Sequence, residues 1–582
     1  MNERGKRGPR DGSMLVALAA WSGHYFFRYG GTAYEWPAKD IAPLVARRLD
    51  PSFLANDFFT NASAEPNPRH AFGFLVTTLA RFLGDDWYAS LFVLRVVAAF
   101  FLPVLWYLVL SGYVRAWFER EQLDGVNERG GFSREDTWPT TFGRLAAALV
   151  VVAGLAQVIR PSVAALFSIA WWSPFQPQAT SSTYSLMFAL CGSSLLLSPA
   201  RFRTAAGVAA WTVASLLHPA VSLFAILFHG IATFGRWRFP SATAVIAVGW
   251  LLPCVLLAIV CRPTVSLDAD EFIRQYVLVR HPSHYWPPAF GSLTECPWWH
   301  SFFLLTGMMF AAVPYAAWRR DRRLAALALA LCGAYAGSVG LQYIAVVAWP
   351  NKLLAMLGPV RFSSLGYFAW LLLAAIVVAD AAALAARRWR SVRPHVGRTG
   401  SAWWKQLLLP RGSALALIAL ASAYVGVTAR DDPFARARRT DPGFYNWIAD
   451  ETPSNGVFAV ADDNVSVDLA LVAHRAVFAG FGLPFREDFF AEYAFRDALL
   501  FGTLEQRAEL SRSLPSGSDP KRAFFRRLGP RDFVRIAAER QLDYVIVEAD
   551  HAENFDAVLP VYGNTTWYVY AIEAIRESLA GR

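Results

Sequence analysis

The 582-residue chain is poor in charge and in cysteine. Asp, Glu, Lys and Arg together make up 17% of its residues, against about 25% in typical soluble domains. Hydrophobic residues make up 55%, including 22 Trp and 43 Phe, so a disordered chain and an ordinary soluble protein are both excluded. The five cysteines are too few for a disulfide framework. The composition predicts a membrane protein.

Several common motifs are also absent. The sequence contains neither G-x-G-x-x-G nor a P-loop, and no internal repeat at a fixed period. The net charge of +10 comes from short basic clusters between apolar runs, a pattern typical of membrane topology. We therefore expect a lipid bilayer as a partner, and no nucleic acid.

About eleven apolar segments are candidates for membrane spans, which need roughly 20 apolar residues each. They cover residues 14–27, 88–114, 145–170, 184–197, 204–217, 220–234, 242–261, 302–318, 324–347, 367–386 and 413–428. Basic clusters recur in alternate connections, which indicates that these connections face the cytoplasm. The N-terminus is then cytoplasmic and the C-terminal part lies outside.

This topology divides the chain into two domains. Residues 1–429 form a helical membrane domain, with outer loops at 29–87, 262–301 and 348–366, and residues 430–582 form a periplasmic domain. In the latter, helix-like segments at 444–452 and 531–541 precede strand-like segments at 456–460 and 543–547, and further strands are expected at 475–479 and 567–572. Alternating helices and strands predict a small α/β domain with a largely parallel sheet. Cys261 and Cys296 flank one outer loop, and we expect them to form a disulfide.

The first outer loop carries carboxylates just after the first span. Glu35, Asp40 and Asp57 lie in this loop, part of which has helical periodicity. A carboxylate just above a membrane helix can act as a general base toward a hydroxyl acceptor, or bind a divalent metal that bridges a diphosphate. The alternative is structural, with these acids solvating a helix on the membrane or capping helices and turns.

The second outer loop combines a cation, two imidazoles and aromatic rings. Arg280, His281, His284 and Tyr285 follow one another closely. An arginine binds phosphate oxygens in bidentate fashion, a histidine donates hydrogen bonds, and an aromatic ring stacks on a sugar. We predict a phosphate and sugar site, and rank a metal lower because the segment has no carboxylate to complete a ligand set. An interfacial belt of aromatic residues is the structural alternative.

The third outer loop places Lys352 and Arg361 near a helix start expected at Ser363. Helix N-termini favour anions, so Arg361 is predicted to bind a phosphate. Alternatively, both cations extend to lipid headgroups. His218, which precedes Pro219 between two short apolar runs, is either a site residue or a satisfied polar group at a tight turn.

Six short sequences carry a resemblance that covers most of the chain. They are Asp50-Pro-Ser-Phe-Leu-Ala-Asn-Asp57-Phe-Phe with Asn67-Pro-Arg69, His218-Pro219, Arg280-His-Pro-Ser-His-Tyr285, Pro359-Val-Arg361, and Trp447-Ile-Ala-Asp-Glu-Thr-Pro453. Together they resemble a group of bacterial multi-pass proteins that is similar to the GT-C superfamily of polyprenyl-phosphate-sugar glycosyltransferases. The resemblance implies an inner-membrane enzyme with a lipid-linked sugar donor. It also implies a glycan or protein acceptor on the periplasmic side and a catalytic Asp or Glu in the first outer loop.

The chain departs from that group in the first outer loop. Where relatives have Asp-Gln and a following His, this sequence has Glu35-Trp36 and Ile41, so Glu35 or Asp40 would have to serve as the base. A glycosyltransferase would need these acids and the cations of the other loops to converge. A transporter or flippase of a polar lipid would need ionisable groups deeper in the spans, where chiefly Arg95 and Asp380 occur. A non-catalytic envelope assembly protein is the third hypothesis.

Overall fold

The computed structural model describes residue 18 and residues 41–124, 178–197, 200–233, 239–280, 282–290, 293, 297–392, 442–480, 485–515, 518–556 and 558–581. The chain forms two compact units, each built from three segments. We call them the helical unit, with Met1–Ala33, Phe92–Leu256 and Ser283–Ala437, and the sheet unit, with Tyr34–Leu91, Leu257–Pro282 and Arg438–Arg582. The sheet unit therefore contains two segments that the sequence assigns largely to outer loops.

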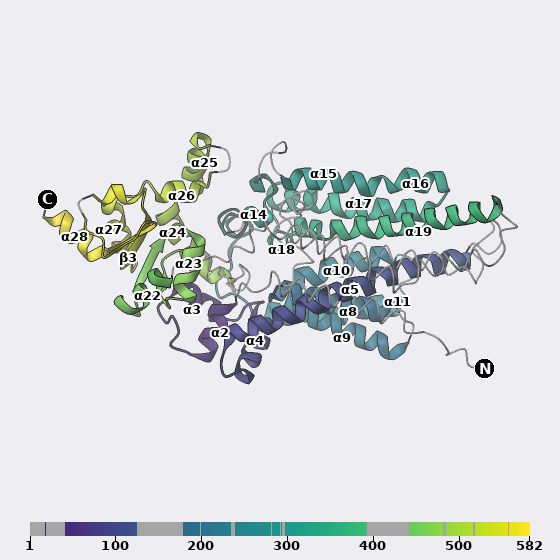
Figure 1. The fold of residues 1–582 in the computed structure, drawn as a ribbon, viewed down its shortest axis with the longest axis horizontal. Coiled ribbons are helices and arrows are strands. Elements are labelled where there is room, and N and C mark those ends of the chain that lie inside the picture. The colour runs from purple at the N-terminus through teal and green to yellow at the C-terminus, as the bar shows by residue number, and fades with distance from the viewer. Residues whose placement is uncertain are drawn as a thin grey trace. The chain divides into compact units, whose positions relative to one another are not determined.

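Helices make up the described part of the helical unit (Figure 1). Its elements are α5 (Trp87–Asp124, from Phe92 on), α8 (Ser181–Leu196), α9 (Arg201–Leu217), α10 (Pro219–Ala232), α11 (Phe239–Ala244), η2 (Val245–Leu251), α12 (Leu252–Val260, to Leu256), α14 (Pro282–Tyr285, from Ser283), η4 (Pro287–Phe290), α15 (Pro297–Phe310), α16 (Ala312–Arg319), α17 (Arg322–Tyr343), η5 (Ile344–Ala348), α18 (Lys352–Leu357), η6 (Pro359–Leu365) and α19 (Gly366–Val392).

Five helical stretches among the described residues are long and apolar enough to cross a membrane. They are Trp87–Glu119, Ser241–Val260, Trp298–Arg319, Arg322–Ala348 and Lys352–Ala381. The first four closely match predicted spans. Lys352–Ala381 overlaps the predicted span 367–386 but also includes most of the predicted outer loop 348–366. Helices α8, α9 and α10 overlap three shorter predicted spans. The predicted spans at 14–27, 145–170 and 413–428 lie almost wholly outside the described residues. The predicted class, a polytopic α-helical membrane protein, is confirmed.

An ion pair between Arg319 and Asp380 lies inside the helical unit. The Asp380 carboxylate on α19 accepts two hydrogen bonds from Arg319 on α16, at 2.7 and 3.0 Å, and one from the Tyr315 hydroxyl at 2.7 Å. A bidentate pair of this kind satisfies a carboxylate that would otherwise be costly in an apolar surrounding. Asp380 therefore joins two helices of the unit.

The sheet unit combines short helices with a small sheet. Outside the C-terminal segment its elements are α2 (Ala42–Leu49), α3 (Phe58–Ala64), α4 (His70–Phe82), α13 (Ala269–Ile273) and η3 (Arg274–Arg280). The C-terminal segment adds α22 (Pro442–Glu451), β1 (Val457–Val460), α23 (Asp463–Leu471), β2 (Ala476–Val477), η8 (Glu487–Phe489), α24 (Phe490–Phe501), α25 (Leu504–Ser513), α26 (Pro520–Phe525), α27 (Pro530–Glu539), β3 (Tyr544–Glu548), η9 (Ala552–Phe555), β4 (Tyr562–Gly563), β5 (Trp567–Ala571) and α28 (Ile572–Ala580).

The sheet has the strand order β2-β1-β3-β5-β4. Strand β1 is parallel to β2 and β3, as predicted, but β5 is antiparallel to both β3 and β4. The expectation of a largely parallel sheet is therefore wrong, and the sheet is mixed. Chain length requires the antiparallel pairing of β4 and β5, because only three residues connect them and a parallel pair needs a crossover of a dozen or more.

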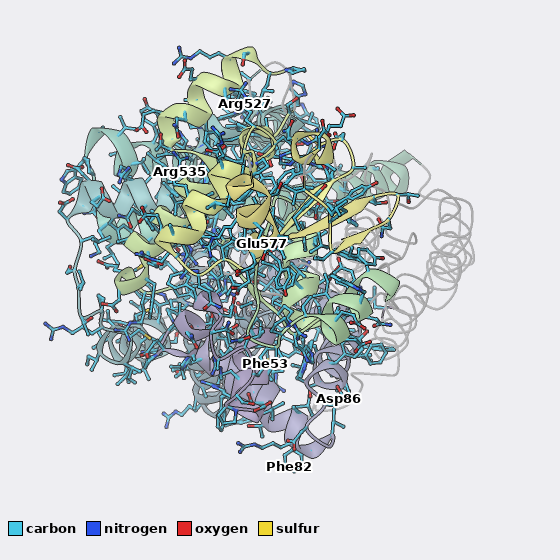
Figure 2. All side chains as sticks on the ribbon, turned by 90° about the vertical axis from the view of Figure 1, so that its left-hand side faces the viewer. Phe53, Phe82, Asp86, Arg527, Arg535 and Glu577 are labelled. Atoms are coloured by element: carbon cyan, nitrogen blue, oxygen red, sulfur yellow. The ribbon has the colours of Figure 1, made fainter. Side chains whose placement is uncertain are left out.

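The described side chains of the sheet unit are shown in Figure 2. Phe53 and Phe82 come from the first outer loop, and Arg535 and Glu577 from α27 and α28 of the C-terminal segment. Segments far apart in sequence thus share one compact unit. Cys261 in this unit is a free thiol in the structure, so the structure does not contain the expected disulfide at Cys261. Cys296 lies outside the described residues.

Candidate functional site

The structure describes some of the predicted site residues and not others. Glu35, Asp40 and His281 lie outside the described residues. His284 belongs to α14, and only its backbone is described. Asp57 and Arg280 lie in the sheet unit, whereas His218, Tyr285, Lys352 and Arg361 lie in the helical unit.

Asp57 is the N-cap of α3 and is 3% exposed. Its Oδ2 accepts a hydrogen bond from the Thr60 amide at 2.7 Å, and its Oδ1 accepts one from the Val477 amide of β2 at 3.0 Å. Burial raises the pKa of this carboxyl, against the effects of these hydrogen bonds and of Arg496. The geometry matches the capping alternative: Asp57 fastens the first outer loop to the sheet.

Arg280 ends η3 and is 6% exposed. Its guanidinium carbon lies 4.9 Å from the ring centroids of both Tyr276 and Phe485 and 5.8 Å from that of Phe490. Cation–π attraction of this kind is strengthened when water is excluded. In the structure Arg280 thus binds the second outer loop to the C-terminal segment of the sheet unit.

His218 lies at the turn between α9 and α10. It is the C-cap of α9 and the N-cap of α10, with Pro219 at the first helical position. Its Nδ1 faces the Val221 amide at 3.5 Å, and its carbonyl accepts a hydrogen bond from Ser185 at 3.3 Å. Proline at this position fits a helix start, because its missing N–H is not needed there. The geometry matches the second alternative, a polar group satisfied at a turn.

Arg361 and Tyr285 are brought together in the helical unit. The guanidinium carbon of Arg361 lies 4.4 Å from the ring centroid of Tyr285, and Tyr285 is 3% exposed. Arg361 is half-buried within η6, a 3-10 turn that leads into α19. The expected helix start at Ser363 therefore falls inside this turn, three residues before α19. Among the described residues no carboxylate lies within ion-pair distance of Arg361.

Gly358 makes this arrangement possible. It has φ +65°, and a Cβ there would overlap the Tyr285 ring, with Tyr285 Cδ1 only 2.7 Å away. Glycine adopts positive φ without strain and lets the ring approach the backbone. The preceding helix α18 begins at Lys352, after Asn351, whose side chain accepts a hydrogen bond from the Leu354 amide at 3.0 Å. The loop thus holds Arg361 on the Tyr285 ring through local backbone geometry.

Two buried polar residues near this turn are absent from the sequence-based set. Gln342 on α17 and Ser363 in η6 are both 0% exposed. Neither side-chain atom of Gln342, nor the Ser363 hydroxyl, has a hydrogen-bond partner among the described residues. A signal was available, because Gln342 is the single amide side chain in the apolar run 324–347. Ser363 offers no comparable signal in sequence.

No group of three or more His, Cys, Asp or Glu side chains that could hold a metal occurs in the described ranges. Of the residues predicted to bind phosphate and sugar, Arg361 and Tyr285 contact each other within the helical unit, and Arg280 contacts aromatic rings within the sheet unit.

These features define a multi-pass helical membrane protein with a second unit built around a small mixed sheet. No protein-family model matches the chain, and no curated protein matches it. Among solved structures, the crystal structure of ArnT from Cupriavidus metallidurans bound to undecaprenyl phosphate is similar. The alignment covers 96% of this chain and 97% of the ArnT chain, with 14% sequence identity and a TM-score of 0.41.

Proposed function

We propose that this chain is a membrane glycosyltransferase that moves a sugar from a polyprenyl-phosphate donor to an acceptor on the periplasmic side. One observation carries the proposal: Arg361 is a half-buried cation that is stacked on Tyr285, in a unit with apolar helices long enough to span a membrane. A fixed guanidinium with no carboxylate partner among the described residues is suited to a lipid-linked phosphate. The sequence resemblance to polyprenyl-phosphate-sugar glycosyltransferases points to the same chemistry.

The proposed reaction breaks the bond between the sugar carbon and a phosphate oxygen and forms a bond from that carbon to the acceptor hydroxyl oxygen. The electron pair of the broken bond stays on the departing phosphate, and Arg361 stabilises its charge. Glu35 or Asp40 takes the proton of the acceptor hydroxyl. Asp57 has no part in this scheme, because both of its oxygens accept backbone hydrogen bonds.

The proposed orientation places the N-terminus in the cytoplasm of a bacterial inner membrane and the C-terminal segment in the periplasm. It rests on the basic clusters of alternate connections. We expect an alkaline-phosphatase fusion after Asp450 to be active and one at Arg393 to be inactive. The reverse pair would contradict the orientation.

The catalytic proposal is tested with purified full-length protein, a panel of undecaprenyl-phosphate sugars and candidate acceptors. We expect Glu35→Gln or Asp40→Asn to lower turnover by roughly 10²- to 10⁴-fold while donor binding is retained. Arg361→Ala should chiefly weaken donor binding. Arg322→Ala, which removes an exposed cation at the opposite end of α17, is the matched control and should leave both unchanged. If both carboxamide variants keep full activity, the mechanism is wrong.

A transporter or flippase of a polar lipid is the second candidate function, and an assembly protein without activity is the third. The ion pair of Arg319 and Asp380 favours the enzyme, because each charge is already matched by the other. Charges that carry a substrate through the membrane must instead be available to it. Movement of the donor lipid across the bilayer without sugar transfer would establish the transporter and exclude the enzyme.

A further inference from the structure

One face of α17 ends in a polar group that its surroundings do not satisfy. Leu331, Tyr335, Ser338 and Gln342 recur at helical spacing and are all buried. The Ser338 hydroxyl donates to the Tyr335 carbonyl at 2.7 Å. The two polar atoms of Gln342 have no partner within the described residues.

This face packs against the turn that carries Arg361. A Cβ at Gly366, the first residue of α19, would overlap the Tyr335 ring. Gln342 lies seven residues beyond Tyr335, or about 10 Å along the helix. Ser363 and Arg361 precede Gly366 by three and five residues, or about 6 and 10 Å of 3-10 turn.

The aromatic contacts agree with this placement. The Trp286 and Tyr343 rings are stacked with centroids 5.6 Å apart, while the neighbouring Tyr285 contacts Arg361. Gln342 and Arg361 therefore lie at the same end of the packed helices, and Ser363 lies in the turn between Arg361 and α19.

Leaving a buried polar group without a partner costs about 1–3 kcal/mol, so buried groups of this kind call for a specific explanation. A carboxamide offers both donors and an acceptor, and a serine hydroxyl offers one of each kind. Sugar hydroxyls need the same combination. A few polar groups among aromatic rings are also typical of small-molecule sites.

We propose that Gln342 and Ser363 hydrogen-bond the hydroxyl groups of a sugar whose phosphate is bound by Arg361. The inference rests on the proposed function and extends it by naming residues that recognise the sugar of the donor. Arg361 then supplies affinity for any polyprenyl phosphate, and Gln342 supplies selectivity for those that carry a sugar.

The test measures equilibrium binding of two lipids to the full-length protein in nanodiscs. The first ligand is undecaprenyl phosphate without a sugar. The second kind is undecaprenyl phosphate that carries a sugar, tested separately with glucose, mannose and arabinose. We expect Gln342→Leu to weaken binding of at least one sugar-bearing lipid about tenfold and to change binding of undecaprenyl phosphate less than about twofold. Ser363→Ala should act in the same direction, and Arg361→Ala should weaken both lipids.

Ser338→Ala is the matched control, because this hydroxyl lies on the same face of α17 but has a protein partner. It should not change the ratio of the two affinities. The inference would be overturned if Gln342→Leu and Ser363→Ala weakened the binding of both kinds of lipid equally, or if neither variant weakened the binding of any lipid. The proposed function would still stand. Binding of neither lipid to the unmodified protein would overturn both. Gln342→Leu should fold, since it removes an unsatisfied polar group from a buried position.

Discussion

Asp57 in the sheet unit and Arg361 in the helical unit are both charged residues of outer loops, yet their surroundings differ. Each oxygen of Asp57 accepts a hydrogen bond from a backbone amide. The Arg361 guanidinium contacts an aromatic ring and no carboxylate among the described residues. Both were predicted as site residues because they are charged and lie in outer loops, and their partners in the structure now distinguish them: the charge of Asp57 is satisfied by backbone amides, whereas Arg361 is the one for which we propose a phosphate ligand.

The largest expected effect comes from removing the satisfied charge. Asp57→Ala leaves the amides of Thr60 and Val477 buried without their acceptor, which should destabilise the sheet unit by about 2–4 kcal/mol. Hydrogen exchange at α3 and β2 in the full-length protein measures this loss.

Asp50→Ala is the control in the same loop. Asp50 is exposed and accepts a hydrogen bond from the Ser52 amide at 2.8 Å, but water can replace it, so the cost should stay within about 0.5 kcal/mol. Equal effects of the two substitutions would show that Asp57 is not the fastening point described above, and the contrast with Arg361 would lose its basis.

A smaller effect is expected in the helical unit. Gly358→Ala places a methyl group against the Tyr285 ring at a backbone with positive φ, and strain of this kind costs about 1–3 kcal/mol. Because Tyr285 supports Arg361, binding of undecaprenyl phosphate should fall together with the melting temperature.

Gly340→Ala is the matched control, since nothing lies within 4 Å of a Cβ added at Gly340 on α17. Alanine is the better helix former by about 1 kcal/mol, so the melting temperature should be unchanged or higher. Normal lipid binding by Gly358→Ala would mean that the Tyr285 contact does not position Arg361.

Much of the fold could be predicted from the sequence, because hydrophobic pattern is a local signal. Each described helical stretch that is long and apolar enough to cross a membrane overlaps a predicted span, and strands β1, β2, β3 and β5 overlap predicted segments. The direction of β5 was not predictable in this way. The direction of a strand is set by the strands beside it in space. One neighbour of β5 is β4, which is only two residues long and gives little signal in the sequence.

Less of the candidate site could be predicted, because burial and hydrogen-bond partners depend on distant residues. Nothing near Asp57 in sequence indicates that its second oxygen accepts from Val477. Likewise, the rings around Arg280 include Phe485 and Phe490 of another segment. Arg361 and Tyr285 were both predicted, but their contact depends on the backbone turn at Gly358.

The hydrogen bond between Asp57 and Val477 joins residues 420 positions apart, which sets an order on biosynthesis. The ribosome makes α3 long before β2, so Asp57 in the first outer loop has no Val477 amide to accept from while the intervening helices are inserted. During that interval Phe59, 5% exposed in the finished unit, lacks its packing partner Tyr493. Contacts of such long range form late and leave apolar surface open to aggregation. The sheet unit is therefore completed only after synthesis of the chain has nearly ended.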